Sequence, residues 1–370
     1  MYPAYPVATV AAARVASHFS GRHGPVHPSA VPDQDTIETI VDAAFWTSLR
    51  SEEGFSPRVS LAFVGPEQTP APLTFERSIP LSPPALTRLA PAVERPGIHL
   101  GVHREDGELR VWGATRRLPA FCFVLEVISP GVLVVKHSRA EKSGKFVNVA
   151  VISGDRIKVI DQHAAATPDC PSVISSLLGL DSDFARPEDI NVLIQLAVSM
   201  REHRRGGLLL VTPSGTDAWK ESILQPITYG IAPAFDGLAA LMSPERERTP
   251  AWEESLHRAV EALAGLTAVD GATIIDAGYR VLAFGAKIVR RRGSPLVPRL
   301  RLTEPVEGTE ARIAEPSEIG GTRHLSAAQF AHDQNDALAL VASQDGRFTV
   351  FGWSACEQMV HARRIESLLL

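Results

Sequence analysis

The chain has 370 residues, of which 45% are hydrophobic and 21% charged, a balance typical of globular domains. This length allows two domains of ordinary size. The net charge of −5 offers no general attraction for nucleic acid, and no apolar run reaches the roughly 20 residues of a membrane span, so we expect neither nucleic acid nor a membrane as a partner. The three cysteines (Cys122, Cys170 and Cys356) are odd in number and far apart, which predicts a cytoplasmic protein without a disulfide framework or a zinc cluster.

The first 33 residues contain many His, Pro and Gly and show little periodicity, which predicts an irregular N-terminal arm over residues 1–33. A signal peptide is not expected, because the apolar stretch "VATVAAARVASHF" is short, contains Arg14 and follows no basic start. His18, His23 and His27 are candidate metal ligands. No Cys or carboxylate cluster accompanies them, and a plain loop is the alternative interpretation.

Residues 34–180 are predicted to form a sheet-rich α+β domain. The stretch "DQDTIETIVDAAFWTSLRSEEG" has the periodicity of an amphipathic helix, with acidic residues at its start, where the helix dipole favours them. From Val59 onward the chain changes to short runs of Val, Ile, Leu and Phe, which are separated by Asp-Gly and Pro-Gly turns. This alternation predicts a series of strands.

A second domain is predicted over residues 184–370, after a linker that contains two prolines. Its first helix is expected to begin at Pro187 and to close at Gly206, and the apolar run "GGLLLV" then forms a buried strand. A helix over residues 252–263 and further strands follow. The predicted class is therefore α/β, with a C-terminal mixed β-sheet flanked by helices and a sheet-rich α+β domain before it.

Two segments of the second domain carry side chains that suit phosphate chemistry. In "VDGATIIDAGYRVLAFGA", Asp270 and Gly271 stand directly before a hairpin strand, so the carboxylate lies on a rigid edge and the glycine permits close approach to the backbone. In "GGTRHLSAA", small residues leave N–H groups accessible before a helix, and Thr322, Arg323 and His324 can donate hydrogen bonds to an anion. The alternative for the second segment is an arginine in an ion pair and a histidine that caps a turn.

The order of these elements resembles the diadenylate cyclase domain, whose signatures are a DGA segment and a GTRHR segment followed by a small-residue helix and a "DA" strand. Residues 270–272 match the first signature and residues 321–324 match the second. "GGLLLV" is similar to a GALIV strand of that family, and the resemblance covers residues 186–368. The N-terminal half resembles soluble sensor domains that are fused to bacterial cyclase domains.

The resemblance implies that two copies of the domain face each other as a homodimer or higher homo-oligomer, each with one ATP, and join the two ATP molecules into cyclic di-AMP and two pyrophosphates. It implies that Asp270, Arg323 and His324 are catalytic. Asp270 and Asp345 would hold Mg²⁺ or Mn²⁺. The residues implied to contact the nucleotide are Gly271, Ala272, Gly321, Thr322 and Ser343.

Two positions depart from the family pattern. Leu325 stands where the family has a second arginine, and losing such a charge-assisted hydrogen bond typically weakens binding by roughly 1.5–3 kcal/mol. Gln344 and Asp345 stand where two glutamates are common, so the metal-binding carboxylate would be shifted by one residue. The cationic run "KIVRRRG" (residues 287–293) is either a substitute for the missing arginine or a solvated loop.

Three alternative functions fit the same sequence. The domain can be a catalytically weak or inactive module that binds nucleotide as a signal, an enzyme of the same fold that makes a linear or mixed dinucleotide, or a dimerisation domain for the N-terminal half. Tight nucleotide binding without turnover would distinguish the first alternative. Competition between ATP and GTP would distinguish the second.

Overall fold

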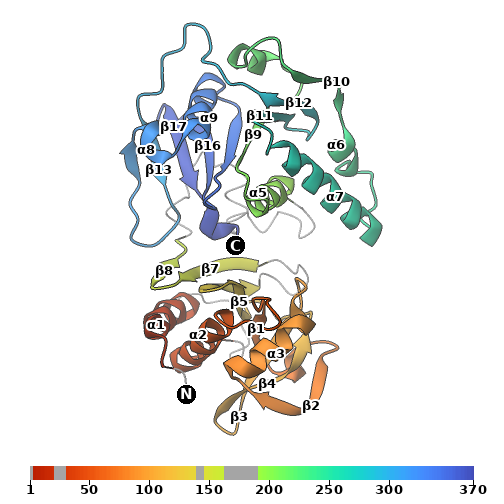
Figure 1. Cartoon of the computed structure of the whole chain (residues 1–370), viewed down its shortest axis with the longest axis vertical. Coiled ribbons are helices and arrows are strands. Elements are labelled where there is room, and N and C mark those ends of the chain that lie inside the picture. The colour runs from red at the N-terminus through yellow and green to blue at the C-terminus, as the bar shows by residue number, and fades with distance from the viewer. Residues whose placement is uncertain (1–2, 21–30, 139–145, 162–190) are drawn as a thin grey trace. The chain divides into compact units, whose positions relative to one another are not determined.

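The computed structural model describes residues 3–20, 31–138, 146–161 and 191–370. These residues form two compact units, one that ends at Ile160 and one that runs from Asp161 to Leu369 (Figure 1). No helix in these ranges combines the length and the apolar composition that crossing a bilayer requires. The predicted boundary near residues 180–184 and the expected helix start at Pro187 lie outside the described residues.

The N-terminal unit is a mixed β-sheet with helices packed on one face (Figure 1). In the described part of the chain its strands pair in the order β2-β4-β3-β1-β5-β6-β7-β8, and all pairs are antiparallel except β1 with β3. The helices are α1 (Pro6–Ser20), α2 (Gln34–Ser48) and α3 (Pro83–Val93). The strands are β1 (Ser60–Phe63), β2 (Leu73–Pro80), β3 (His99–Glu105), β4 (Glu108–Thr115), β5 (Phe123–Ser129), β6 (Val132–Ser138), β7 (Phe146–Ser153) and β8 (Arg156–Val159).

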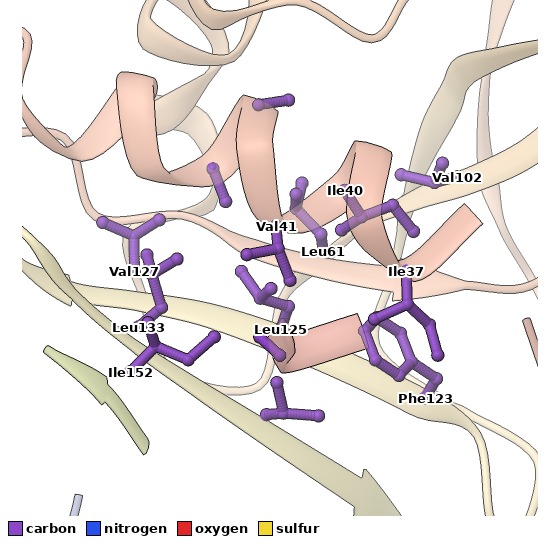
Figure 2. Close-up of a cluster of buried hydrophobic side chains, with 14 of the residues drawn as sticks. Ile37, Ile40, Val41, Leu61, Val102, Phe123, Leu125, Val127, Leu133 and Ile152 are labelled. Carbon is purple, nitrogen blue, oxygen red and sulfur yellow. The ribbon is translucent and has the colours of Figure 1, made fainter. Parts of the chain in front are cut away.

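Helix α2 confirms the predicted amphipathic helix and anchors the core of this unit. It begins after Asp33, whose carboxylate accepts a hydrogen bond from the backbone N–H of Thr36 at 2.8 Å. Figure 2 shows its apolar side chains directed toward side chains of the sheet, among them Leu125. Each large apolar side chain buried in this way contributes about 1.5–3 kcal/mol to folding.

The prediction of an irregular arm over residues 1–33 is wrong for its first part, because residues 6–20 form helix α1 within the core of the N-terminal unit. A buried stripe recurs every three or four residues and consists of Ala8, Ala11, Ala12, Val15 and Phe19. Its alanines give a weak apolar periodicity, which explains why the pattern is inconspicuous. His18 lies on this helix, whereas His23 and His27 lie outside the described residues.

The C-terminal unit is a second mixed sheet. Across its described residues the strand order is β10-β12-β11-β9-β15-β16-β17-β13-β14, with β9 parallel to β11 and β13 parallel to β17. The strands are β9 (Gly207–Thr212), β10 (Tyr229–Phe235), β11 (Ala272–Asp276), β12 (Val281–Ala286), β13 (Leu300–Thr303), β14 (Arg312–Ala314), β15 (Leu338–Ala342), β16 (Phe348–Ser354) and β17 (Met359–Arg364). The helices are α5 (Val192–Glu202), α6 (Gly237–Leu241), α7 (Pro250–Leu266), α8 (Pro316–Ile319) and α9 (Thr322–Asp333).

Strand β9 lies in the middle of this sheet and is buried on both faces. Leu208 and Leu210 belong to the apolar cluster that includes α9, and the alternation of side chains along a strand turns Leu209 and Val211 to the opposite face. Helix α5 contacts β15 and α7. The predicted mixed sheet with helices, the β11–β12 hairpin, the buried strand and the helix over residues 252–263 are therefore confirmed.

Candidate functional site

A cavity of about 630 Å³ lies at one edge of the C-terminal sheet and brings the two sequence signatures together. All predicted site residues except Ala272 line it: Asp270, Gly271, Gly321, Thr322, Arg323, His324, Ser343 and Asp345. Its volume is within the range of about 300–1,000 Å³ that is usual for small-molecule sites. The predicted residues thus form one site rather than several separate loops.

The strand register explains why these distant segments meet. Strands β9 and β11 run parallel and start at the same edge, and Gly207 at the start of β9 pairs with Ala342 at the end of β15. Ala272 at the start of β11 pairs with Ala286 at the end of β12. The residues before β9 and β11 and those after β12 and β15 therefore gather at one edge, where lining residues from the first turn of α9 join them.

The Arg323 guanidinium lies against the backbone before β9. A Cβ atom placed on Gly206 would lie 2.7 Å from Nη1 of Arg323 and 3.3 Å from the backbone oxygen of Ala342. Gly206 also has a φ of +71°, a conformation that favours glycine. The guanidinium occupies the space that a side chain at position 206 would fill, which places a cation in the cavity wall at the positive end of α9.

His324 is buried on the first turn of α9, with 6% of its surface exposed. Its ring meets Phe351 edge-on at 6.0 Å between ring centroids, and a Cβ on Gly320 would lie 2.7 Å from its Cε1 atom. Burial lowers the pKa of His324, and the nearby arginines, Arg364 first, lower it further against an opposing effect of Asp345. The imidazole is therefore neutral at neutral pH and can donate a hydrogen bond without carrying charge.

Asp270 is an exposed carboxylate beside the cavity, and its partner is Lys287. The Lys287 ammonium group donates a hydrogen bond to Oδ2 of Asp270. This hydrogen bond and the charge of Lys287 lower the pKa of Asp270, with a smaller contribution from Arg323. Asp270 is accordingly an ionised acceptor that is accessible to a ligand hydroxyl or a cation.

Asp345 lies in the turn after β15 and pairs with Arg347. Its Oδ1 accepts a hydrogen bond of 3.3 Å from the Arg347 backbone N–H, and its Oδ2 lies 3.4 Å from Arg347 Nε. The N–H of Ser343 donates to the Arg347 oxygen at 2.9 Å, which closes the turn. The turn thus presents a hydroxyl, a carboxylate and a guanidinium at the cavity.

Gly271 and Ala272 have structural roles that the sequence pattern did not indicate. Gly271 has a φ of +116°, and a Cβ there would lie 2.5 Å from the carbonyl carbon of Gly285. The group that comes close to the Gly271 backbone is therefore the neighbouring strand β12. Gly271 also lines the cavity. Ala272 is fully buried in the core cluster and is absent from the cavity lining, because it points into the sheet packing. Its side chain therefore does not line the cavity, and its contact with the nucleotide stays a prediction.

Leu325 has 44% of its surface exposed and is not part of the cavity lining. The cationic residues of the lining are Arg323, Lys287 and Arg347. Lys287 comes from the "KIVRRRG" run, which agrees with the suggestion that this run supplies a cation.

Two residues of the site were not predicted from the sequence. Arg347 has no local pattern that would indicate it. Gly206 could have been found, because a pair of glycines stands at the start of the buried strand β9.

The cavity can bind a divalent cation only if protein side chains and a phosphate ligand share its coordination. Asp270 and Asp345 are the carboxylates in its described lining, and the hydroxyls of Thr322 and Ser343 add oxygen donors. Mg²⁺ prefers oxygen ligands and is often held by one or two carboxylates together with substrate phosphates. No group of three His, Cys, Asp or Glu side chains suited to a metal occurs among the residues that the structure covers, so phosphate oxygens would have to complete the coordination.

A second cavity of about 770 Å³ lies at the other end of α9, and its lining includes Arg291 and Arg292. It surrounds Asp333, whose carboxylate accepts hydrogen bonds from the Arg291 backbone N–H at 2.8 Å and from Gln329 at 2.9 Å. Ser294 donates to the same carboxylate at 2.5 Å. Asp333 is therefore engaged in holding loops together, and none of the nine predicted site residues lines this cavity.

The N-terminal unit matches a family of sensor domains. Residues 27–116 match the family described as "Probable sensor domain DACNV". This match covers less than half of the chain and leaves the C-terminal unit outside it. No curated protein matches the chain.

The solved structures that are similar to part of the chain include the following two. One is a hypothetical membrane spanning protein from Bacillus cereus, with 16% identity and a TM-score of 0.27 over 46% of this chain; the match covers 61% of that chain, less than two thirds of its length. The other is a double cysteine mutant of DacA from Staphylococcus aureus, with 17% identity and a TM-score of 0.25 over 48% of this chain and 90% of that one. TM-scores of this size do not establish a common fold.

Proposed function

We propose that the C-terminal unit is a diadenylate cyclase, which condenses two ATP molecules into cyclic di-AMP and two pyrophosphates, and that the N-terminal unit regulates it as a sensor domain. The observation that carries the proposal is the convergence of the DGA and GTRH segments on one cavity of suitable volume. The match of residues 27–116 to the DACNV sensor family supports the regulatory role. The proposed setting is the cytoplasm, where ATP is available.

In the proposed reaction the 3′-hydroxyl of one ATP attacks the α-phosphorus of the other. A P–O bond forms to the 3′-oxygen, the bond to pyrophosphate breaks, and the hydroxyl proton leaves; the step then repeats with the roles of the two nucleotides exchanged. The protein supplies alignment and charge compensation more than covalent chemistry. This demand fits a cavity whose lining supplies hydrogen-bond donors from Thr322, Arg323 and His324.

Four residues of the cavity lining have proposed roles that their positions support. Arg323 lies against Gly206 in the cavity wall and can form two hydrogen bonds to phosphate oxygens. Neutral His324 and the Thr322 hydroxyl donate further hydrogen bonds. Asp270, ionised and accessible, accepts the proton of the attacking 3′-hydroxyl or orients it.

Mg²⁺ or Mn²⁺, held by Asp270 and Asp345 with phosphate oxygens, would neutralise charge on the triphosphate. The attacking hydroxyl and the phosphate come from different ATP molecules, and this unit has one such cavity in its described residues. Two copies must therefore face each other, most simply around a twofold axis. The proposed active species is a homodimer or higher homo-oligomer.

The test is incubation of the purified full chain with ATP and either Mg²⁺ or Mn²⁺, followed by mass spectrometry of the products. Cyclic di-AMP is the expected product. Absence of any cyclic dinucleotide with both metals and in every separable oligomeric state would rule the enzyme out. Tight ATP binding in that case would favour the alternative, a nucleotide-binding regulatory module, and a linear or mixed dinucleotide would favour a different reaction on the same fold.

A further inference from the structure

The three cationic side chains in the cavity lining have different surroundings. The Arg323 guanidinium lies against Gly206. Arg347 and Lys287 both pair with exposed carboxylates: Arg347 Nε lies 3.4 Å from Oδ2 of Asp345, and the Lys287 ammonium group donates a hydrogen bond to Asp270. Of these two carboxylates, Asp270 is the one proposed to act on the attacking hydroxyl, so an exchange of partner by Lys287 bears directly on the proposed reaction.

The backbone of Lys287 is anchored although its side chain is not enclosed. Residue 287 follows the last residue of β12, and its carbonyl oxygen accepts a hydrogen bond of 2.8 Å from the Leu224 N–H. The Lys287 side chain is 53% exposed. The Cα position is therefore set at the cavity wall, and the flexible four-carbon stem leaves the ammonium group free to change partner.

The ion pair itself favours such an exchange. The Asp270 side chain is 89% exposed, and ion pairs between exposed groups are weak because water screens them. A triphosphate carries more negative charge than one carboxylate, and its oxygens form strong charge-assisted hydrogen bonds. A phosphate group in the cavity would therefore compete successfully with Asp270 for Lys287.

We propose that Lys287 is a nucleotide-binding residue that leaves Asp270 when a triphosphate enters the cavity and binds a phosphate oxygen instead. In the absence of nucleotide, Lys287 donates a hydrogen bond to Oδ2 of Asp270. On binding, the exchange releases that oxygen for the attacking hydroxyl. This inference rests on the proposed function, because it takes the ligand of the cavity to be a nucleoside triphosphate.

The chain offers a matched control for Lys287. Lys220 also pairs with an aspartate, Asp217, at 2.9 Å between Nζ and Oδ2, and its side chain is 47% exposed. Neither residue lines the cavity. Removing Lys220 therefore deletes a comparable exposed ion pair without touching the proposed binding site.

The experiment compares ATP and adenosine binding by isothermal titration calorimetry to the full-length chain and to its Lys287→Ala, Lys287→Arg and Lys220→Ala variants. Lys287→Ala is expected to weaken ATP binding by about tenfold or more and to change adenosine binding little, because one charge-assisted bond to phosphate is lost. Lys287→Arg should recover most of the ATP affinity, and Lys220→Ala should behave like the unmodified chain. Thermal unfolding of each variant checks that the fold is retained.

Unchanged ATP affinity in Lys287→Ala would overturn the inference, and so would an equal loss of ATP and adenosine affinity, which would indicate a structural role. These outcomes are separable from failure of the proposed function. If the unmodified chain forms cyclic di-AMP and Lys287→Ala binds ATP normally, the inference fails and the function stands. If Lys287→Ala loses ATP selectively but no cyclic dinucleotide forms, the phosphate contact stands and the cyclase proposal fails.

Discussion

The Arg323 guanidinium occupies the space above Gly206, so that a Cβ atom at position 206 would lie 2.7 Å from Nη1. Because position 206 is a glycine, the Arg323 side chain has room to lie against the backbone before β9. Lys287, by contrast, has its described interaction with Asp270. The cavity thus combines a cation that lies against the backbone with one that pairs with an exposed carboxylate, and the first prediction concerns Arg323.

Gly206→Ala should displace Arg323 and weaken ATP binding by about tenfold or more, because a charge-assisted contact with phosphate is lost. The positive φ of +71° also makes alanine unfavourable, by roughly 1 kcal/mol of folding free energy. Gly215→Ala is the control, since Gly215 has a φ of +77° but nothing within 4 Å of a Cβ. Titration calorimetry and thermal unfolding of both variants separate the two effects; equal ATP affinities would show that the contact with Arg323 does not matter.

Asp270→Asn should abolish product formation, with a decrease of about a hundredfold or more in rate, because the amide can neither accept the hydroxyl proton nor hold a divalent cation in the same way. The exposed Asp270 side chain makes little contribution to the core, so the thermal unfolding of the variant should match that of the unmodified chain. Asp217→Asn, which removes an exposed carboxylate outside the cavity, should retain activity. An active Asp270→Asn variant would contradict the role assigned to this residue.

Asp333→Asn should lower the free energy of unfolding by about 2 kcal/mol at neutral pH, because several donors around this buried carboxylate would lose a charged acceptor. Burial raises the pKa of Asp333, but hydrogen bonds from His332, Ser294, the Arg291 N–H and Gln329 outweigh burial and lower it overall. The folded pKa therefore lies below the unfolded value of about 3.9.

This lowered pKa sets the sign of the pH dependence. The stabilisation by Asp333 is present above about pH 4 and is lost as the pH falls through the folded pKa, since the unfolded chain then binds the proton more tightly. The difference in unfolding free energy between the unmodified chain and Asp333→Asn should shrink over that range. Denaturant titrations from pH 7 downward measure it, and a difference that grows on acidification would contradict the assignment.

Cys122 should resist alkylation in the folded chain, because its thiol is fully buried and burial raises its pKa to about 12. Cys356 is exposed and should react under the same conditions. Peptide mass spectrometry after a short iodoacetamide treatment measures both sites, and labelling in denaturant shows that both peptides are detectable. Rapid native labelling of Cys122 would contradict the packing of the N-terminal unit.

The parts of the structure that could be predicted from the sequence are those with a local pattern. Helix α2 and the β11–β12 hairpin have clear periodicity or turn residues, and the two signatures indicated residues that do line one cavity. Helix α1 was missed because its buried stripe consists largely of alanines, which give little hydrophobic contrast. The burial of the Ala272 side chain in the core could not be foreseen, because a signature match does not show which way a strand side chain points.

The contacts that position the site depend on strand register and could not be predicted. Lys287 lies beside Asp270 because Ala286 pairs with Ala272 across β12 and β11. Gly206 meets Arg323 because β9 pairs with β15 at the edge where α9 begins. Such pairings are tertiary, and neither a single segment nor its composition specifies them.

The central claim, that the C-terminal unit joins two ATP molecules, is tested most directly with an equimolar mixture of unlabelled ATP and ATP labelled with ¹³C in the adenosine. The purified chain is incubated with this mixture and Mn²⁺, and the cyclic product is analysed by mass spectrometry. The account predicts three masses, for products with no, one and two labelled adenosines, of which the mixed product is the most abundant. Formation of ADP or AMP alone, or of no nucleotide product, would contradict it.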